Sequence, residues 1–403
     1  MASYDAIIIG AGMVGMATAI GLAQSGLNVA LVDKMPLSDQ TLPTFDGRVS
    51  AIALASKRLL DNLGIWQSMA AHAEPIMDIR VVDSSSPFYL HYDYEEVGDE
   101  PFGWIVQNRH TRCALLEKLH ALSSHIALYA PDSIATLDQG IASNNVTLKS
   151  GKALLAPLLI VADGKFSKTR EMMGVPAQTI PYDHTAIVCT IAHEKPHHGL
   201  ALERFFGVGP FAVLPMQGQR SSLVWTEKHD MAKHMVSLPE DDLAEEIYTR
   251  TDGYLGNVSI EGRCFSYPLS LVFAKDYTAN RAVLIGDAAH GIHPIAGQGV
   301  NLGFRDVAAL VEVLTKAKRL GLDMGSQVVL ADYSKWRSFD AASMVVVTDG
   351  INRLFSNNNT LLSAARKTGL ATVSKIPPLK QFYMRHAMGL TGDVPKLMQE
   401  RNG

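Results

Sequence analysis

The chain has 403 residues, 47% hydrophobic and 19% charged, an ordinary globular composition whose length predicts two or three domains. Its net charge of −4 argues against a nucleic-acid-binding protein. Cys113, Cys189 and Cys264 are widely spaced, which argues against a disulfide framework or a zinc site and favours a reducing compartment. No signal peptide and no apolar run of about eighteen residues is found, so we expect a cytoplasmic protein.

The N-terminal segment has the pattern of a strand, a helix and a second strand. Tyr4 to Ile9 predicts a buried strand, and Met13 to Gln24 predicts a helix that Gly26 ends. Asn28 to Val32 predicts the next strand. A strand, helix and strand within about 30 residues form a βαβ unit.

The rest of the chain first continues this alternation and then changes character. Further helices are predicted at Ala53–Leu63, Gln107–Leu122 and Val300–Lys316. Buried or short strands are predicted at Ile126–Tyr129, Ile134–Leu137, Val146–Leu148, Leu154–Ala162 and Ala282–Ile285, and Pro157 interrupts the fourth of them early. Alternating runs between residues 179 and 273 predict an antiparallel sheet, and examples are Thr185–Ile191, Ala212–Leu214 and Ser222–Thr226.

This order predicts an α/β fold in which a Rossmann-type domain is split in the sequence. We expect the nucleotide-binding domain to comprise residues 1–75, 105–175 and 275–340. An inserted antiparallel β-sheet substrate domain is expected at residues 76–104 and 176–274, and a helical C-terminal tail at residues 341–403.

The loop after the first predicted strand carries a GxGxxG sequence, Gly10-Ala11-Gly12-Met13-Val14-Gly15. The motif is meaningful here because it lies between a strand and a helix. Gly10 allows the tight turn, Gly12 lets the backbone approach a pyrophosphate, and Gly15 lets the helix pack on the strand. Asp33 ends the second strand, where an acid can bond ribose hydroxyls. The motif predicts a dinucleotide but does not separate NAD from FAD.

A second segment, Asp163-Gly164, follows a buried strand and is a weak signal alone, because Asp-Gly is common in turns. The third segment, Arg281–Gly303, is more specific. Its strand delivers Gly286 and Asp287 to the carboxyl end of the sheet, where α/β folds bind ligands, and Asp287 could bond a ribityl hydroxyl.

The end of this third segment favours a flavin. The glycines Gly297 and Gly299 let the backbone lie against a flat ring. Backbone N–H groups around Gly299–Asn301, at the start of the next helix, would stabilise the negative charge of a reduced flavin. The three segments together therefore predict FAD.

The segment Gly286–Asp306 closely resembles the signature of ubiquinone-biosynthesis hydroxylases, which are flavin monooxygenases of the p-hydroxybenzoate-hydroxylase-like class. The resemblance covers nearly the whole chain and implies a Rossmann-type FAD domain with an inserted antiparallel substrate domain. Further matching segments begin at Arg48, Gln107, Arg366 and Arg385. One departure is Asp33, where the class usually has Glu, so we expect weaker retention of FAD.

The motifs and the resemblance assign a set of residues to FAD. Arg48 either contacts FAD or helps to admit nicotinamide. The assigned residues are Gly10, Gly12, Met13, Val14, Gly15, Asp33, Arg48, Gln107, Ile134, Asp163, Gly164, Gly286, Asp287, Pro294, Gly297, Gln298, Gly299, Val300 and Asn301.

The resemblance also implies a reaction. NAD(P)H reduces FAD, O2 adds to flavin C4a, and the hydroperoxide hydroxylates an electron-rich aromatic ring. The catalytic candidates are His290, for which local bonding near Asp287 is the simpler interpretation, and Pro294, whose carbonyl would lie near the reaction face. No metal is expected, because neither the His290/His293 pair nor any other histidine has ligand spacing with carboxylates or cysteines.

The C-terminal residues 361–403 contain seven Lys or Arg and two Asp or Glu, hence a charge of 7 − 2 = +5. Interleaved with apolar residues, this charge predicts a face for a membrane surface or a partner, or else a solvated face that closes the fold. A lipid-tailed aromatic substrate would favour peripheral contact with the inner membrane or with other quinone-biosynthesis proteins. Assembly as a homo-oligomer stays open.

Two other functions stay open at this point. The same fold could serve a hydroxylase or epoxidase of a soluble aromatic substrate, although a halogenase is disfavoured because no two tryptophans are spaced as WxW. The chain could also be a non-catalytic component that holds FAD within a quinone-biosynthesis complex.

Overall fold

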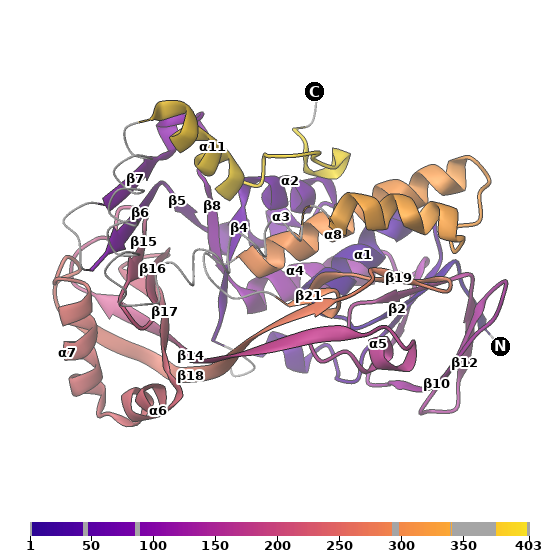
Figure 1. Ribbon diagram of the computed structural model, residues 1–403, viewed down its shortest axis with the longest axis horizontal. Coiled ribbons are helices and arrows are strands. Elements are labelled where there is room, and N and C mark those ends of the chain that lie inside the picture. The colour runs from indigo at the N-terminus through magenta and orange to yellow at the C-terminus, as the bar shows by residue number, and fades with distance from the viewer. Residues whose placement is uncertain are drawn as a thin grey trace.

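The computed structural model describes residues 2–42, 47–84, 89–291, 298–338, 340 and 376–400. It is an elongated α/β molecule with its two large sheets toward opposite ends (Figure 1). Strands β14 (Ala177–His193) and β18 (Val258–Ala274) are each 17 residues long and run between the two ends. The predicted α/β fold class is confirmed.

The six-stranded sheet contains the N-terminal βαβ unit. Its order is β19-β20-β13-β2-β3-β9, and all neighbours are parallel except β19 and β20. Its strands are β2 (Ala6–Ile9), β3 (Val29–Val32), β9 (Ile126–Tyr129), β13 (Leu158–Val161), β19 (Thr278–Ala279) and β20 (Ala282–Leu284). Parallel strands buried on both faces are continuous apolar runs, as these are.

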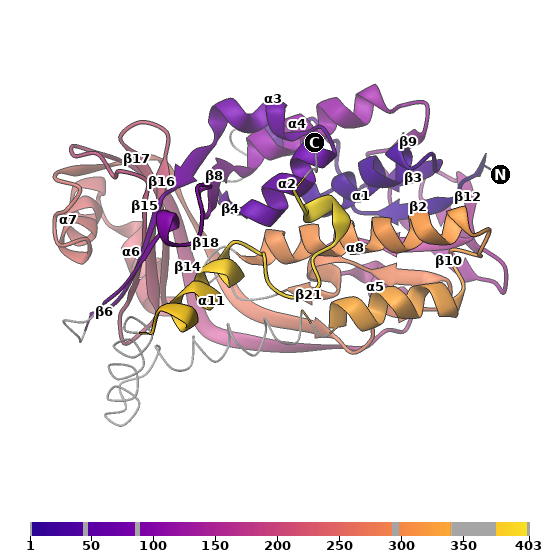
Figure 2. The ribbon, with the colours of Figure 1, turned by 90° about the horizontal axis from the view of Figure 1, so that it is seen from above.

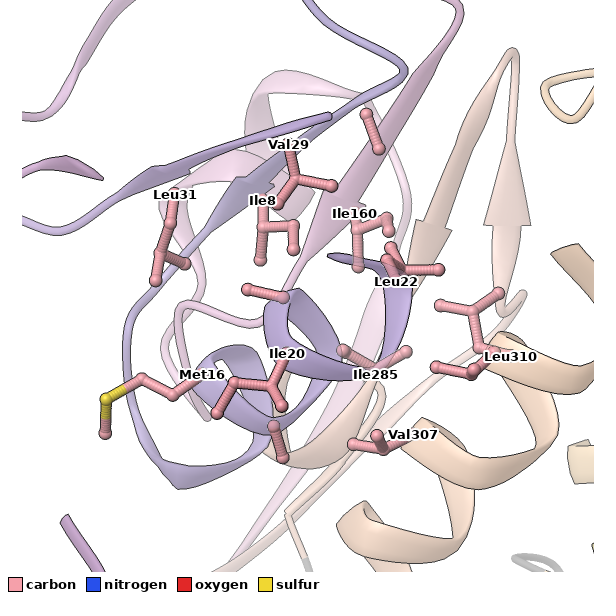
Figure 3. Packing of buried hydrophobic residues seen from close by; sticks show 14 of the residues in the cluster. Ile8, Met16, Ile20, Leu22, Val29, Leu31, Ile160, Ile285, Val307 and Leu310 are labelled. Carbon is pink, nitrogen blue, oxygen red and sulfur yellow. The ribbon is translucent and has the colours of Figure 1, made fainter. Parts of the chain in front are cut away.

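Helix α1 (Met13–Gln24) has the predicted bounds and packs against α8 (Gln298–Arg319) beside this sheet. Figure 3 shows Ile20 of α1 with Val307 of α8 among the side chains of the strands. This apolar cluster fixes the starts of both helices relative to the ends of the strands.

The run Leu154–Ala162 was predicted as one strand that Pro157 interrupts early. The interruption is confirmed, but the assignment of both parts to one strand is wrong. The structure has two strands there, β12 (Ala153–Ala156) and β13, which belong to different sheets. Pro157 lies between them, and it has no backbone N–H to donate to a sheet ladder. Strand β12 joins β1 (Ala2–Ser3), β10 (Ile134–Gln139) and β11 (Asn144–Leu148) in a four-stranded sheet.

The eight-stranded sheet has the order β21-β18-β14-β17-β16-β15-β6-β7. Its core from β18 to β15 is antiparallel, as predicted, whereas β15 pairs with β6 in parallel. The remaining strands are β6 (Asp78–Asp83), β7 (Tyr89–Asp93), β15 (Leu200–Phe205), β16 (Pro210–Met216), β17 (Arg220–Lys228) and β21 (His290–Gly291).

The two faces of this sheet meet different surroundings, because successive side chains of a strand point to opposite faces. On one face, Ile187, Phe211 and Trp225 pack in a cluster with α6 (His229–Ser237) and α7 (Glu240–Arg250). Figure 2 shows α7 on the outer side of the sheet, far from α1. The residues between these positions face the other way, and that inner face borders the functional site.

Smaller elements connect the two ends. A three-stranded sheet has the order β4-β8-β5, and its neighbours include α11, which buries Met384 there. These elements are β4 (Val49–Ala53), β5 (Glu74–Ile76), β8 (Gly103–Gln107), α2 (Leu54–Asn62), α3 (Trp66–Met69), α4 (Asn108–Ala121), α5 (Lys168–Met172), helical residues 327–338 and α11 (Pro377–Ala387). Within the described residues, none of the helices has the length and apolarity needed to cross a membrane. The domain boundaries stay a prediction.

Candidate functional site

One cavity of about 600 Å³ is lined both by the carboxyl ends of the six-stranded sheet and by the inner face of the eight-stranded sheet. This volume lies within the usual range for small-molecule sites. The first side contributes Gly12, Met13, Val14, Ala162, Gly164, Gly286, Asp287, Gly299 and Val300. The sheet side contributes Ala186, Val188, Glu203, Pro210, Ala212, Leu214, Val224, Thr226 and Tyr267.

The glycines of the first loop are required for two different physical reasons. A Cβ on Gly10 would lie 2.3 Å from the carbonyl oxygen of Ala162, and one on Gly15 would lie 1.9 Å from the carbonyl oxygen of Gly10. These two positions are therefore closed to larger residues by the backbone itself. A Cβ on Gly12 would meet no protein atom within 4 Å, so this glycine faces open space in the cavity.

Two helix N-termini border this cavity. Helix α1 begins after Gly12, which caps it without a side-chain hydrogen bond, and α8 begins at Gln298. The first N–H groups of a helix have no partner within the helix, and the dipole makes this end positive. The open space beside Gly12 thus fits a pyrophosphate, and the α8 end beside Gly299 fits an anionic ring edge.

Asp33 holds the glycine loop from the end of β3. Its carboxylate oxygens accept hydrogen bonds from the backbone N–H groups of Ala11, at 2.7 Å, and Met35, at 2.9 Å. Each oxygen keeps a further lone pair. The ribose contact of Asp33 and the weaker FAD retention stay predictions.

The two residues of the Asp163-Gly164 turn have different roles. Gly164 lines the cavity, with a φ of 89°. Asp163 accepts hydrogen bonds from the Ser167 hydroxyl and, at 2.8 Å, from the Thr169 hydroxyl. The carboxylate therefore fixes the start of α5, which also holds the turn in place.

Asp287 projects into the cavity from the end of the six-stranded sheet. Its side chain is open to the cavity, yet the surrounding protein removes bulk water, and this desolvation raises the pKa of Asp287. The positive charges of His290, Lys165 and Arg48 oppose the rise. Lys165 also lines the cavity, and its ammonium donates to the Ser270 carbonyl.

His290 lies in a buried network behind Gly286 instead of on the cavity. Its Nε2 is 2.6 Å from Oδ2 of Asp306, which also accepts from the Gly286 N–H at 2.8 Å. Oδ1 of Asp306 accepts from Nε of Arg337 at 2.7 Å. Burial opposes ionisation of Asp306, but His290 and Arg337 outweigh it and lower its pKa.

This placement argues against the predicted proton-transfer role of His290. The side chain is 1% exposed and is absent from the cavity lining, so it reaches no bound group in this conformation. Through Asp306 it fixes the turn at Gly286 and the direction of Asp287.

Other predicted FAD residues are distributed around the cavity. Arg48 lines it, whereas Ile134 is buried in β10 away from it. Gln107 lines a second pocket of about 150 Å³ and accepts from Nε of Arg109 at 2.8 Å. The Asn301 amide links to β4, and Pro294, Gly297 and the side chain of Gln298 lie outside the described residues.

Ser50 and Asn108 of the cavity lie in the matching segments that begin at Arg48 and Gln107, whereas sequence reasoning missed Arg112, Lys165, Glu203, Thr226 and Tyr267. Arg112 lies four residues after Asn108 on α4 and so shares its helix face, a spacing that could have found it. Lys165 directly follows the Asp-Gly turn. Glu203 has no local pattern that marks it.

Comparison with known proteins decides the family. The family model described as FAD binding domain matches residues 3–347. The chain belongs to this FAD binding domain family. Its predicted cofactor, FAD, is therefore confirmed, in agreement with the two helix N-termini at the cavity.

Within the FAD binding domain family, the curated relatives carry hydroxylase names. Ubiquinone hydroxylase UbiL of Rhodospirillum rubrum is 44% identical, covering 98% of this chain and 92% of the relative. The 3-demethoxyubiquinol 3-hydroxylase of Escherichia coli is 32% identical, covering 95% and 98%. The predicted membership among ubiquinone-biosynthesis hydroxylases is confirmed.

A solved structure shows the same fold at low identity. The p-nitrophenol 4-monooxygenase PnpA from Pseudomonas putida DLL-E4 superposes with a TM-score of 0.79 at 18% identity. The match covers 98% of this chain and 100% of that chain.

Proposed function

We propose that the chain is an FAD-dependent monooxygenase that hydroxylates the aromatic ring of a polyprenylated ubiquinone precursor, with NAD(P)H and O2 as co-substrates. The observation that carries the proposal is the single cavity that joins two helix N-termini to an apolar sheet face. The names of the relatives, which include a ubiquinone hydroxylase and a 3-demethoxyubiquinol 3-hydroxylase, support the substrate class.

One side of the cavity would bind FAD. The N–H groups at Gly12–Val14 would hold the pyrophosphate, and Asp287 would bond the ribityl chain. Those at Gly299 and Val300 would bond the pyrimidine edge of the flavin. Bound FAD supplies the redox chemistry, since it accepts the reducing equivalents of NAD(P)H and activates O2.

The sheet side would hold the substrate ring. Ala186, Val188, Ala212 and Val224 form a wall of small apolar side chains opposite the flavin side. Such a wall leaves room for a flat ring and excludes water from the reacting atoms, which a flavin hydroxylase needs.

The experiment is deletion of the gene followed by mass spectrometry of the quinone intermediates. We expect a prenylated phenol or quinone precursor that lacks one ring hydroxyl to accumulate, and the gene for the Gly12→Val variant to fail to restore synthesis. An unchanged intermediate pool would contradict the assigned pathway. A Gly12→Val protein that lacks FAD yet restores synthesis would instead support a non-catalytic component.

We also propose that α11 forms a contact with the membrane surface from which a lipid-tailed substrate enters. The exposed fractions of Phe382 and Tyr383 are 54% and 41%, although both are large and aromatic. Arg385 lies on the same helix, and Lys380 of that helix is paired with Glu96. An exposed apolar face with basic residues is typical of a peripheral membrane contact.

A further inference from the structure

Glu203 occupies an unusual position on the inner face of the eight-stranded sheet. The strand register places it in one row with Val81 of β6, Ala212 of β16 and Val224 of β17. Every other member of this row is apolar. A carboxylate in such a row loses hydration, which costs free energy unless the group gains a partner.

No partner for Glu203 occurs among the residues that the structure describes. Hydrogen bonds and ion pairs in that part of the chain leave its carboxylate free, whereas the nearby Glu227 and Glu261 bond Arg250 and Arg220. A carboxylate left without a partner on the wall of a cavity indicates that a polar atom of a ligand binds there.

The cavity places Glu203 opposite the flavin side. Glu203 lines the same space as Asp287, Gly299 and Val300, so a ring held there faces both walls. Asp287 is the carboxylate on the flavin side, and Glu203 is the one on the sheet side. A phenolic hydroxyl directed away from the flavin would meet Glu203.

We propose that the Glu203 carboxylate is the general base that accepts the proton of the substrate's phenolic hydroxyl. This inference rests on the proposed hydroxylation of a phenol. In the step, the phenol O–H bond breaks and the proton forms an O–H bond with a Glu203 carboxylate oxygen. The electron pair stays on the phenol oxygen and enriches the ring carbons that receive the electrophilic oxygen atom.

The electrostatic surroundings make Glu203 a stronger base than an exposed carboxylate. Burial raises the pKa of Glu203 to about 7, which brings it to within about 3 units of a phenol near 10. A base with a pKa near the working pH is the most effective. The charged or titratable groups around it are Asp83 on the same face of β6, none on β16, Tyr267 on β18 of the same sheet, and Arg48, Arg112, Lys165 and Asp287 across the cavity.

The test uses the FAD-loaded enzyme and a phenol that carries one isoprene unit, with the hydroxylated product measured by mass spectrometry between pH 5.5 and 9, roughly the range around a pKa near 7. Only the ionised carboxylate accepts a proton, so wild-type kcat/KM should rise through about pH 7 and then level off. Glu203→Gln should lower the plateau by about 100-fold or more and abolish this rise. Glu203→Asp should keep the rise at a reduced rate.

A second substrate separates a base from a structural residue. A ring-fluorinated phenol that is already ionised at pH 8 needs no base, so the Glu203→Gln enzyme should hydroxylate it within a few-fold of wild type. The matched control is Glu261→Gln, which removes an exposed carboxylate of the same sheet and should leave the pH profile unchanged. FAD content and Tm of the variants check folding.

The outcomes distinguish this inference from the proposed function. If wild type hydroxylates the phenol and Glu203→Gln keeps both the rate and the rise near pH 7, the assignment of Glu203 is wrong. An equal loss of hydroxylation rate on both phenols, or loss of FAD in both Glu203 variants, would likewise overturn the assignment of Glu203. If wild type hydroxylates neither phenol, the proposed function itself is wrong, and the inference that rests on it is wrong as well.

Discussion

At the scale of single residues, Gly12 and Gly15 lie in one loop but have different surroundings. The space beside Gly12 is open, whereas that beside Gly15 is filled by the Gly10 carbonyl. We therefore predict that Gly12→Val folds normally and lowers FAD affinity by tenfold or more, since about 1.4 kcal/mol of lost phosphate contact suffices. Flavin fluorescence titration of the apoprotein measures this affinity.

The matched variant is Gly15→Val, which should fail to fold because its Cβ would lie 1.9 Å from a backbone oxygen. Circular dichroism and Tm of the two apoproteins distinguish them. Equal loss of folded protein in both variants would contradict the assignment of open space to Gly12.

Asp306 gives a second prediction at this scale, because it is buried between His290 and Arg337. Arg337→Met should lower the free energy of unfolding by about 3–5 kcal/mol, since the Asp306 charge loses its Arg337 partner inside the protein. The lowered pKa of Asp306 means that this stabilisation is present at neutral pH and is lost only as the pH falls below about 4. Urea unfolding at pH 7 measures the change.

The control for this prediction is Arg220→Met, which removes an ion pair whose side chains are 37% and 46% exposed. It should cost at most about 1 kcal/mol. A similar cost for the two variants would show that burial does not set the strength of the Asp306 network.

Single residues differ in how far the sequence alone predicts them. The glycines of the first loop were predictable, because their roles come from a strand and a helix adjacent in the chain. Glu203 was not, because its surroundings come from Val81 and Val224, which only the sheet register brings together. Local bonding of His290 was the simpler interpretation of the sequence, but its partner Asp306 was not predicted, because Asp306 lies on a later helix.

At the scale of elements, periodicity predicted α1 to the residue, because a buried helix between two buried strands has sharp limits. The interruption at Pro157 was predicted, but not that the strands on its two sides belong to different sheets. Apolar character shows that both strands are buried, but it does not show which neighbours they have.

Helix α11 provides a prediction at this scale. Replacing both Phe382 and Tyr383 with Ser should weaken binding to vesicles containing anionic phosphatidylglycerol by about tenfold or more, since each aromatic side chain loses apolar burial in the interface. Vesicle co-sedimentation measures the binding. Tyr248→Ser on α7, whose side chain is 46% exposed, is the control and should bind as wild type does. If the wild-type protein does not bind the vesicles, the proposed membrane contact is wrong.

At the scale of the whole molecule, the cavity exists because segments from residue 12 to residue 300 meet around one space. Its motif side was predictable as a FAD site. Its sheet side was not, because antiparallel pairing over long sequence distances leaves no local pattern that says which face is inward.

The combined cavity predicts a preference for prenylated rings. Because each buried CH2 contributes about 0.8 kcal/mol, one isoprene unit should raise kcat/KM at least about tenfold over unsubstituted phenol. Product formation with the two substrates measures the ratio. Equal values would favour a soluble aromatic substrate instead.

The two faces of the eight-stranded sheet also affect how such an enzyme can change its substrate during evolution. Along β14, β16 and β17, every second side chain belongs to the packed cluster with α6 and α7, and the side chains between them border the cavity. Mutations at Val188, Ala212 or Val224 can therefore reshape the ring slot while Ile187, Phe211 and Trp225 go on anchoring the sheet. Descendants of one ancestor could thus acquire new substrates with little loss of foldability, and a designer who wishes to redirect the enzyme has the same positions available.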